Sequence, residues 1–218
     1  MTYAAPFIVL EGPEGAGKSH QAGILSAWLR EQGWDVVQTR EPGGTAAGDA
    51  IRAILLQSDD LHLLPETEAL LMTAARAQHV RETVIPALEQ GNAVVCDRYV
   101  DSTYAYQGGG SDIPLERLRP LQDFATDGLE PDIRFLLDVP VEIGLARRHD
   151  DAGQVNRIDR APVEFHQRVR AAFLQLADAA PNSWVVIDAT ASIDDVSQAI
   201  RAAAQARLGA FAGGGEPT

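Results

Sequence analysis

Residues 12–19 of the chain read Gly-Pro-Glu-Gly-Ala-Gly-Lys-Ser and match the pattern G-x-x-x-x-G-K-[ST]. They directly follow a short apolar run and open a stretch with the apolar spacing of a helix. In this strand–loop–helix context, backbone N–H groups surround phosphate oxygens, Lys18 reaches the β- and γ-phosphates, and the Ser19 hydroxyl ligates Mg²⁺. The alternative is a glycine-rich structural turn. The predicted nucleotide-binding loop consists of Gly12, Pro13, Glu14, Gly15, Ala16, Gly17, Lys18 and Ser19.

Short apolar runs alternate with helical stripes along the rest of the chain. The runs lie at residues 7–10, 36–37, 93–96, 133–137 and 184–187. Near-continuous apolar runs of this length are typical of strands buried on both faces of a parallel sheet. The alternation predicts an α/β fold, a five-stranded parallel sheet with helices on both faces.

Two stretches interrupt this alternation. Residues 99–112 hold three tyrosines and three consecutive glycines, and residues 147–160 are rich in ionisable side chains. We interpret both as loops, and the second as a lid, since such loops often lie beside the chemistry. No linker or repeat divides the chain. We therefore expect one domain over residues 1–208 and a disordered tail over residues 209–218.

The charge balance narrows the possible partners. The formal net charge of −13 argues against a protein that binds a nucleic-acid polymer, which normally presents a basic stripe. Arginines that bind an anionic ligand must then be gathered locally. No apolar stretch approaches 18 residues, and no signal peptide is evident, so we expect a cytoplasmic protein without a membrane partner.

Asp97 and Arg98 follow the third apolar run and indicate a kinase. In P-loop proteins, a later strand usually ends in an aspartate that helps to hold the metal ion. A motor ATPase would place a glutamate next as a base for water, whereas an arginine suits bidentate binding of a second phosphate. The alternative is a structural ion pair between the two side chains. A phosphate acceptor, with a second pKa near 6, needs no general base.

Several segments together resemble bacterial thymidylate kinases over roughly residues 7–207. The segments are 7–19, 39–45, 74–79, 97–99, 105–108, 129–132, 156–159 and 165–169. The resemblance implies a P-loop fold of the nucleoside monophosphate kinase type. It also implies ATP and dTMP as substrates, Mg²⁺ as cofactor held through Ser19 and Asp97, and a homodimer.

The resemblance implies roles for individual residues. Glu14 would lie near the sugar 3′-hydroxyl, and Tyr106 where a ribose 2′-hydroxyl would lie. Arg98, with Arg40 and Arg52, would hold the acceptor phosphate. Arg76, Thr103 and Gln107 would read the thymine, while the turn that begins at Glu41 would hold Arg40. The implied substrate-binding residues are Glu14, Arg40, Glu41, Arg52, Met72, Arg76, Arg98, Thr103, Tyr106 and Gln107.

The chain departs from the family in two places. Met72 stands where the family usually stacks a phenylalanine on thymine, although a thioether can also cover an aromatic face. The loop carries Ala16 where some relatives have an arginine, so we expect the lid to supply the cation. Arg148 is the first candidate and Arg147 the second. The predicted catalytic residues are Lys18, Arg98, Arg148 and Arg147.

Two other functions remain open at this point. One is a different P-loop small-molecule or nucleoside monophosphate kinase, which acceptor screening would separate. The other is a regulatory P-loop ATPase, which would hydrolyse ATP without an acceptor.

Overall fold

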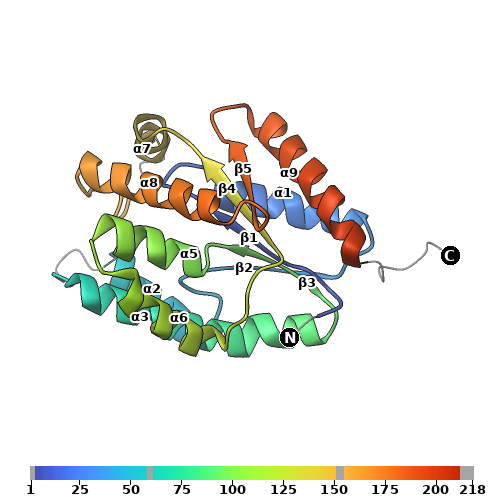
Figure 1. Cartoon of the computed structure of the whole chain (residues 1–218), viewed down its shortest axis with the longest axis horizontal. Coiled ribbons are helices and arrows are strands. Elements are labelled where there is room, and N and C mark those ends of the chain that lie inside the picture. The colour runs from blue at the N-terminus through green and yellow to red at the C-terminus, as the bar shows by residue number, and fades with distance from the viewer. Residues whose placement is uncertain (1–2, 58–60, 151–154, 212–218) are drawn as a thin grey trace.

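The computed structural model describes residues 3–57, 61–150 and 155–211 (Figure 1). Its sheet has five parallel strands in the order β2-β3-β1-β4-β5. The strands are β1 (Phe7–Glu11), β2 (Val36–Arg40), β3 (Ala93–Asp97), β4 (Ile133–Asp138) and β5 (Trp184–Asp188). The predicted five-stranded parallel sheet is confirmed.

Strand β1 is central and buried on both sides. Ile8 and Leu10 belong to the hydrophobic core on one face of the sheet, and Phe7 and Val9 to the core on the other. This division follows from the period of two along a strand. Leu10 lies opposite Asp97 of β3, so the residues after β1 and β3 emerge together at the carboxyl edge.

Helices cover both faces of the sheet, as predicted (Figure 1). Helices α1 (Lys18–Glu31) and α9 (Ile193–Leu208) contribute Leu29 and Ile200 to the core on one face. The opposite face packs against the segment that continues α3 (Pro65–His79) and against α8 (Val163–Ala179). The continuation of α3 is a π-helical turn, Val80–Val84, followed by α4 (Ile85–Glu89).

The remaining helical segments lie around the edges of the sheet. They are α2 (Ala46–Gln57), α5 (Val100–Thr103), a π-helical segment (Tyr104–Gly110), α6 (Leu115–Thr126), α7 (Val141–Asp150) and a 3₁₀ turn (Gly209–Phe211). Within the described ranges, no helix is long and apolar enough to cross a membrane.

The two expected loops are partly helical, which corrects the sequence interpretation. Most of the first is α5 and the π-helical segment, because its glycines let the backbone approach α8. A Cβ atom on Gly109 would lie 2.5 Å from that of Ala172. The start of the second expected loop is the last turn of α7. Residues 151–154 of that loop, and residues 212–218 of the expected tail, lie outside the described ranges.

Candidate active site

A cleft of about 1060 Å³ opens at the carboxyl edge of the sheet. The phosphate-binding loop lies on one side of it, and side chains from α2, α3, α5 and the π-helical segment lie on the other. Despite the net charge of −13, positive side chains are gathered here, as the sequence analysis expected. The cations that line the cleft are Lys18, Arg40, Arg52, Arg98, Arg147, Arg148 and Arg157.

Glycines fit the loop tightly against neighbouring backbone. A Cβ atom on Gly15 would lie 2.0 Å from the carbonyl oxygen of Gly144 in α7, and one on Gly12 would lie 2.4 Å from that of Leu137. Both positions also have positive φ angles, which favour glycine. The loop is therefore held between β4 and α7.

Lys18 begins α1 and is 7% exposed. Its Nζ donates to the Pro13 carbonyl at 2.7 Å, a contact that places the amine inside the curve of the loop. Burial, followed by the charge of Arg98, lowers the pKa of Lys18 to about 8, although the carboxylates of Asp97 and Glu14 oppose the shift.

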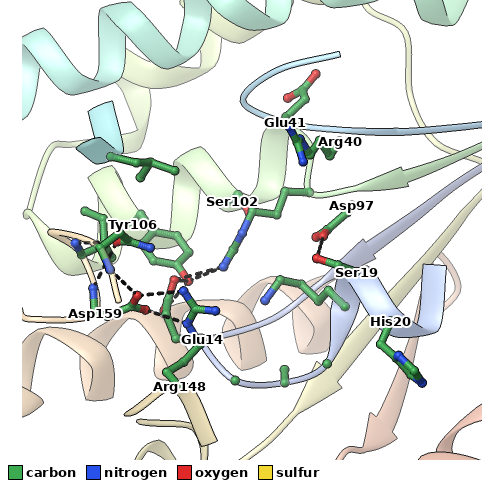
Figure 2. A pocket seen from close by; sticks show the side chains of 18 of the residues that line it. Glu14, Ser19, His20, Arg40, Glu41, Asp97, Ser102, Tyr106, Arg148 and Asp159 are labelled. Carbon is green, nitrogen blue, oxygen red and sulfur yellow. Dashed lines mark hydrogen bonds and ion pairs between the residues drawn. The ribbon is translucent and has the colours of Figure 1, made fainter. Parts of the chain in front are cut away.

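Ser19 and Asp97 point toward one another (Figure 2). The Ser19 hydroxyl donates a short hydrogen bond to Asp97 Oδ2. The other carboxylate oxygen, Oδ1, is buried and has no hydrogen-bond partner among the described residues. A hydroxyl and a carboxylate with an unused oxygen form a donor set that suits Mg²⁺.

Arg98 has a backbone φ of 73°, a conformation that costs a non-glycine residue roughly 1–3 kcal/mol. This bend turns the guanidinium toward the phosphate loop. Nη1 donates to the Gly12 carbonyl and the Ser102 hydroxyl, each at 3.1 Å. Nη2 donates to Glu14 at 3.0 Å and to the Tyr106 hydroxyl at 2.9 Å. Burial alone would lower the pKa of Arg98, but Tyr106 and the nearby carboxylates raise it above its usual value.

Glu14 forms a buried cluster with Arg98 and Tyr106. The Tyr106 hydroxyl lies 2.6 Å from both carboxylate oxygens of Glu14. Burial by itself would raise the pKa of Glu14, but His166, Arg98 and Lys18 together lower it to about 2. The carboxylate therefore stays charged at neutral pH beside the phosphate loop.

The sequence analysis assigned no role to His166, which completes this cluster from α8. Its Nδ1 lies 3.6 Å from Glu14 Oε2, and the residue is 1% exposed. Two indirect signals in the sequence pointed to it: His166 lies in one of the segments that resemble the family, and it is a polar residue beside the apolar stripe of Phe165 and Val169.

Glu11, the last residue of β1, supports the cluster by binding the segment that follows Arg98. Its carboxylate accepts from the backbone N–H groups of Tyr99 and Ser102 and from the Ser102 hydroxyl at 2.6 Å. These contacts fix the segment that follows Arg98. Burial, together with the charge of Asp101, raises the pKa of Glu11 from 4.5 to about 7.

The raised pKa of Glu11 predicts a pH-dependent stability. Between pH 4.5 and about 7 the folded state binds this proton and the unfolded state does not, so the free energy of unfolding falls as pH rises. We expect Glu11→Gln to remove this part of the decrease, and the exposed control Glu116→Gln to keep it. Urea denaturation at pH 5, 6, 7 and 8 measures both slopes. Equal slopes in Glu11→Gln and the parent would contradict this protonation.

On the side of the cleft opposite the loop, Arg40, Glu41 and Arg52 line the wall. Arg40 is largely exposed and lies 3.7 Å from Asp49. Arg52 donates to the Pro42 carbonyl at 2.9 Å, and burial together with the charge of Arg40 lowers its pKa. Both guanidinium groups therefore line the cleft across from the loop, and Arg40 forms a loose, exposed ion pair with Asp49.

The four residues expected to contact the thymine fall into two groups by their place in the structure. Met72 and Gln107 line the cleft, and Gln107 Oε1 is buried without a partner among the described residues. Arg76 and Thr103 are fully buried and do not line it. The Arg76 guanidinium bonds four groups from three segments of the chain. These are Glu41 Oε2, Thr103 Oγ1, Gln122 Oε1 and the Tyr99 carbonyl.

The two candidate lid arginines lie in the last turn of α7. Arg147 donates to the Ala189 carbonyl at 2.8 Å. Arg148 forms a bidentate pair with the buried Asp159, at 3.1 and 2.9 Å. Farther along, Arg157 reaches Glu68 of α3 at 2.7 Å. The lid segment thus contacts both the loop side and the α3 side of the cleft.

A phosphate loop that faces an Asp-Arg pair and further arginines across one cleft, on this parallel sheet, defines a P-loop kinase of the nucleoside monophosphate kinase class. Comparison with known proteins gives the particular family. The sequence model of thymidylate kinase matches residues 10–200. The chain belongs to the thymidylate kinase family, which makes it an ATP-dependent phosphotransferase.

Curated relatives agree over most of the chain. It is 52% identical to a thymidylate kinase of Thermomicrobium roseum, over 89% of this chain and 91% of the relative. It is 47% identical to one from Pseudomonas putida (strain GB-1), over 90% and 93%. It is 46% identical to one from Pelobacter propionicus, over 89% and 91%. The resemblance predicted from the sequence is confirmed.

Proposed function

We propose that the protein transfers the γ-phosphoryl group of Mg²⁺-bound ATP to dTMP, giving dTDP and ADP. One observation carries this proposal. A single cleft holds the phosphate loop, Arg98 beside it, and Arg40 and Arg52 on the far wall, so that a donor and an anionic acceptor can meet there. We also propose a cytoplasmic location, since the one cysteine, Cys96, is free and buried, which fits a reducing compartment.

We assign the Mg²⁺ site to the Ser19 hydroxyl and, through water, to Asp97. The unpartnered Oδ1 of Asp97 supports this assignment, because a buried oxygen without a partner is rare. The ion would neutralise charge on the phosphates. Lys18 would hold the β- and γ-phosphates from within the loop.

We assign the acceptor phosphate to Arg98, with Arg40 and Arg52. At neutral pH most of the acceptor is already a dianion, since its second pKa is near 6. Its oxygen can attack without a general base, so the chain contributes by position and charge.

We assign the nucleoside to the wall formed by α3 and the π-helical segment. Met72 would cover the thymine ring, and the free carbonyl of Gln107 would accept from its N–H group. Arg76 and Thr103 are buried behind this wall, and they would support it through the hydrogen bonds that Arg76 makes to Thr103 and Glu41. Tyr106 and Glu14 would lie beside the deoxyribose, with Glu14 at the 3′-hydroxyl.

Arg148 remains our first candidate for the cation that meets the transferring phosphoryl group, and Arg147 the second. We expect Arg148→Ala to lower kcat by up to about 10²-fold, less than the 10³–10⁵ of an arginine finger, with little change in either KM. Such a pattern marks an interaction made mainly in the transition state. Steady-state kinetics of Arg147→Ala, Arg148→Ala and the double variant test the assignment. Unchanged turnover in all three would move the cation elsewhere in the lid.

We propose that two copies pair through α3 and α6. These helices pack against each other, and they expose Leu70 (55%) and Phe124 (80%). Large apolar side chains on neighbouring surfaces often mark a protein contact. Light scattering should give twice the 23.4 kDa mass of the chain. A single-chain mass at all concentrations would rule out the dimer.

The substrate itself is tested by measuring ADP release with ATP fixed and a panel of monophosphates. We expect dTMP to be the best acceptor. A higher kcat/KM for another monophosphate would identify a different kinase of this class. ADP release without any acceptor would instead indicate a regulatory ATPase.

A further inference from the structure

His166 is the one member of the Glu14 cluster without a role in the proposed reaction. It lies in the first turns of α8, which packs against the π-helical segment that carries Tyr106. The side chain is 2% exposed, and the ring of Phe165 stands perpendicular to its ring at 5.5 Å. The imidazole is therefore confined between the Glu14 carboxylate and the ring of Phe165.

The two ring nitrogens of His166 have different surroundings. Nδ1 lies 3.6 Å from Glu14 Oε2, somewhat longer than a hydrogen bond. Nε2 is buried and has no partner among the described residues. Because Nδ1 faces the Glu14 carboxylate and Nε2 has no partner among the described residues, the tautomer with its proton on Nδ1 best matches this site.

Arg98 has two competing uses. All four N–H groups of its Nη atoms already donate hydrogen bonds, to Gly12, Ser102, Tyr106 and Glu14. A phosphate that takes a bidentate grip on this guanidinium must replace at least one of these partners, and Glu14 is the one with the same charge as the phosphate. The carboxylate would then lose its one cationic hydrogen bond among the described residues while it remains buried.

A buried carboxylate that loses a partner is destabilised unless another donor replaces it. Tyr106 supplies one hydroxyl proton, and that proton is shared between both oxygens of Glu14. His166 Nδ1 is the nearest remaining donor from outside the loop and Arg98. A shift of a few tenths of an ångström would bring it into hydrogen-bond range of Oε2.

We propose that His166 is a positioning residue for phosphoryl transfer: it holds the Glu14 carboxylate toward the acceptor's 3′-hydroxyl when Arg98 turns to the acceptor phosphate. This inference rests on the proposed function, since it takes the acceptor to be a deoxynucleoside monophosphate with its 3′-hydroxyl at Glu14. It adds a residue of α8 to the site.

Three substitutions separate positioning from packing. His166→Asn keeps an N–H group close to the position of Nδ1, His166→Gln places one near Nε2, and His166→Leu fills the space without a donor. Circular dichroism and thermal melts check that each variant folds. If the leucine variant does not fold, the comparison of Asn with Gln still tests the proposal.

Each variant is assayed with dTMP and with the analogue that lacks the 3′-hydroxyl. With dTMP, we expect Leu and Gln to lower kcat/KM by about ten- to a hundredfold, the range of a charge-assisted hydrogen bond, and Asn to stay within about threefold. The KM for ATP should not change. With the 3′-deoxy analogue, all variants should lie within about threefold of the parent, because the contact that His166 orients is absent.

The outcomes are distinguishable from a failure of the proposed function. If the parent does not phosphorylate dTMP, the proposed function fails. In that case calorimetric titration of dTMP and of the 3′-deoxy analogue into the same variants replaces the kinetic comparison. Equal losses for dTMP and the analogue, or equal losses in Asn and Gln, would overturn the proposal and leave His166 a packing residue.

Discussion

Replacing Lys18 with alanine is expected to lower kcat by about 10²–10³-fold, the usual effect of removing a preorganised donor at developing charge. The Lys18 amine lies inside the loop, 2.7 Å from the Pro13 carbonyl, where the phosphates of the donor would lie. The loss should appear with every acceptor. Calorimetry should show that dTMP still binds, since the arginines opposite the loop are intact.

Arg30→Ala is a matched control for this prediction. Arg30 belongs to the same helix, α1, but it lies at the far end and contacts the Val36 carbonyl. Its removal also takes away one positive charge, so any general effect of net charge would appear in both variants. Full turnover in Lys18→Ala would refute the assignment of the donor phosphates to the loop.

Replacing Arg98 with alanine is expected to damage use of the acceptor. Truncating one side of a desolvated charge pair costs roughly 2–5 kcal/mol, which corresponds to about a 30-fold to several-thousand-fold weaker Kd for dTMP. Glu14 would also lose its partner at 3.0 Å, so part of the effect would come from a less ordered carboxylate. Titration calorimetry with dTMP and with ATP separates the two sides of the cleft.

Arg98→Lys serves as the control because it keeps the charge and removes the planar fork. We expect an intermediate loss of dTMP affinity, since an ammonium cannot grip the phosphate at two points. ATP affinity should stay close to that of the parent in both variants. An unchanged dTMP affinity in Arg98→Ala would mean that Arg98 is a structural residue of the β3 edge.

The parallel sheet was predictable because its strands are short, apolar and separated by helical stripes. The phosphate loop was predictable because its chemistry requires specific residues at fixed spacing. The segment from Val100 to Gly110 was not. Its three glycines are typical of a loop, and only contact with Phe165 and Ala172 of α8 makes a helix favourable there. Because this stabilisation comes from a tertiary contact, it leaves no pattern in the local sequence.

The site was predicted in part for the same reason. Asp97 and Arg98 follow a strand, so their place at the sheet edge could be deduced. Arg76 was expected at the cleft surface, whereas it is completely buried, because its partners come from three segments that meet only in the fold. The pairing of Arg148 with Asp159 across the end of α7 was equally invisible in the sequence.

The amine within the phosphate loop has a chemical consequence. Lys18 is the only lysine among the 218 residues. Its pKa of about 8 leaves a substantial fraction of the amine uncharged and nucleophilic in mildly alkaline solution. An acylating reagent can therefore attack this side chain and the terminal amino group, but no other amine in the chain. Acylation of Lys18 should therefore be slower when a nucleotide occupies the loop, and the acylated enzyme should be inactive.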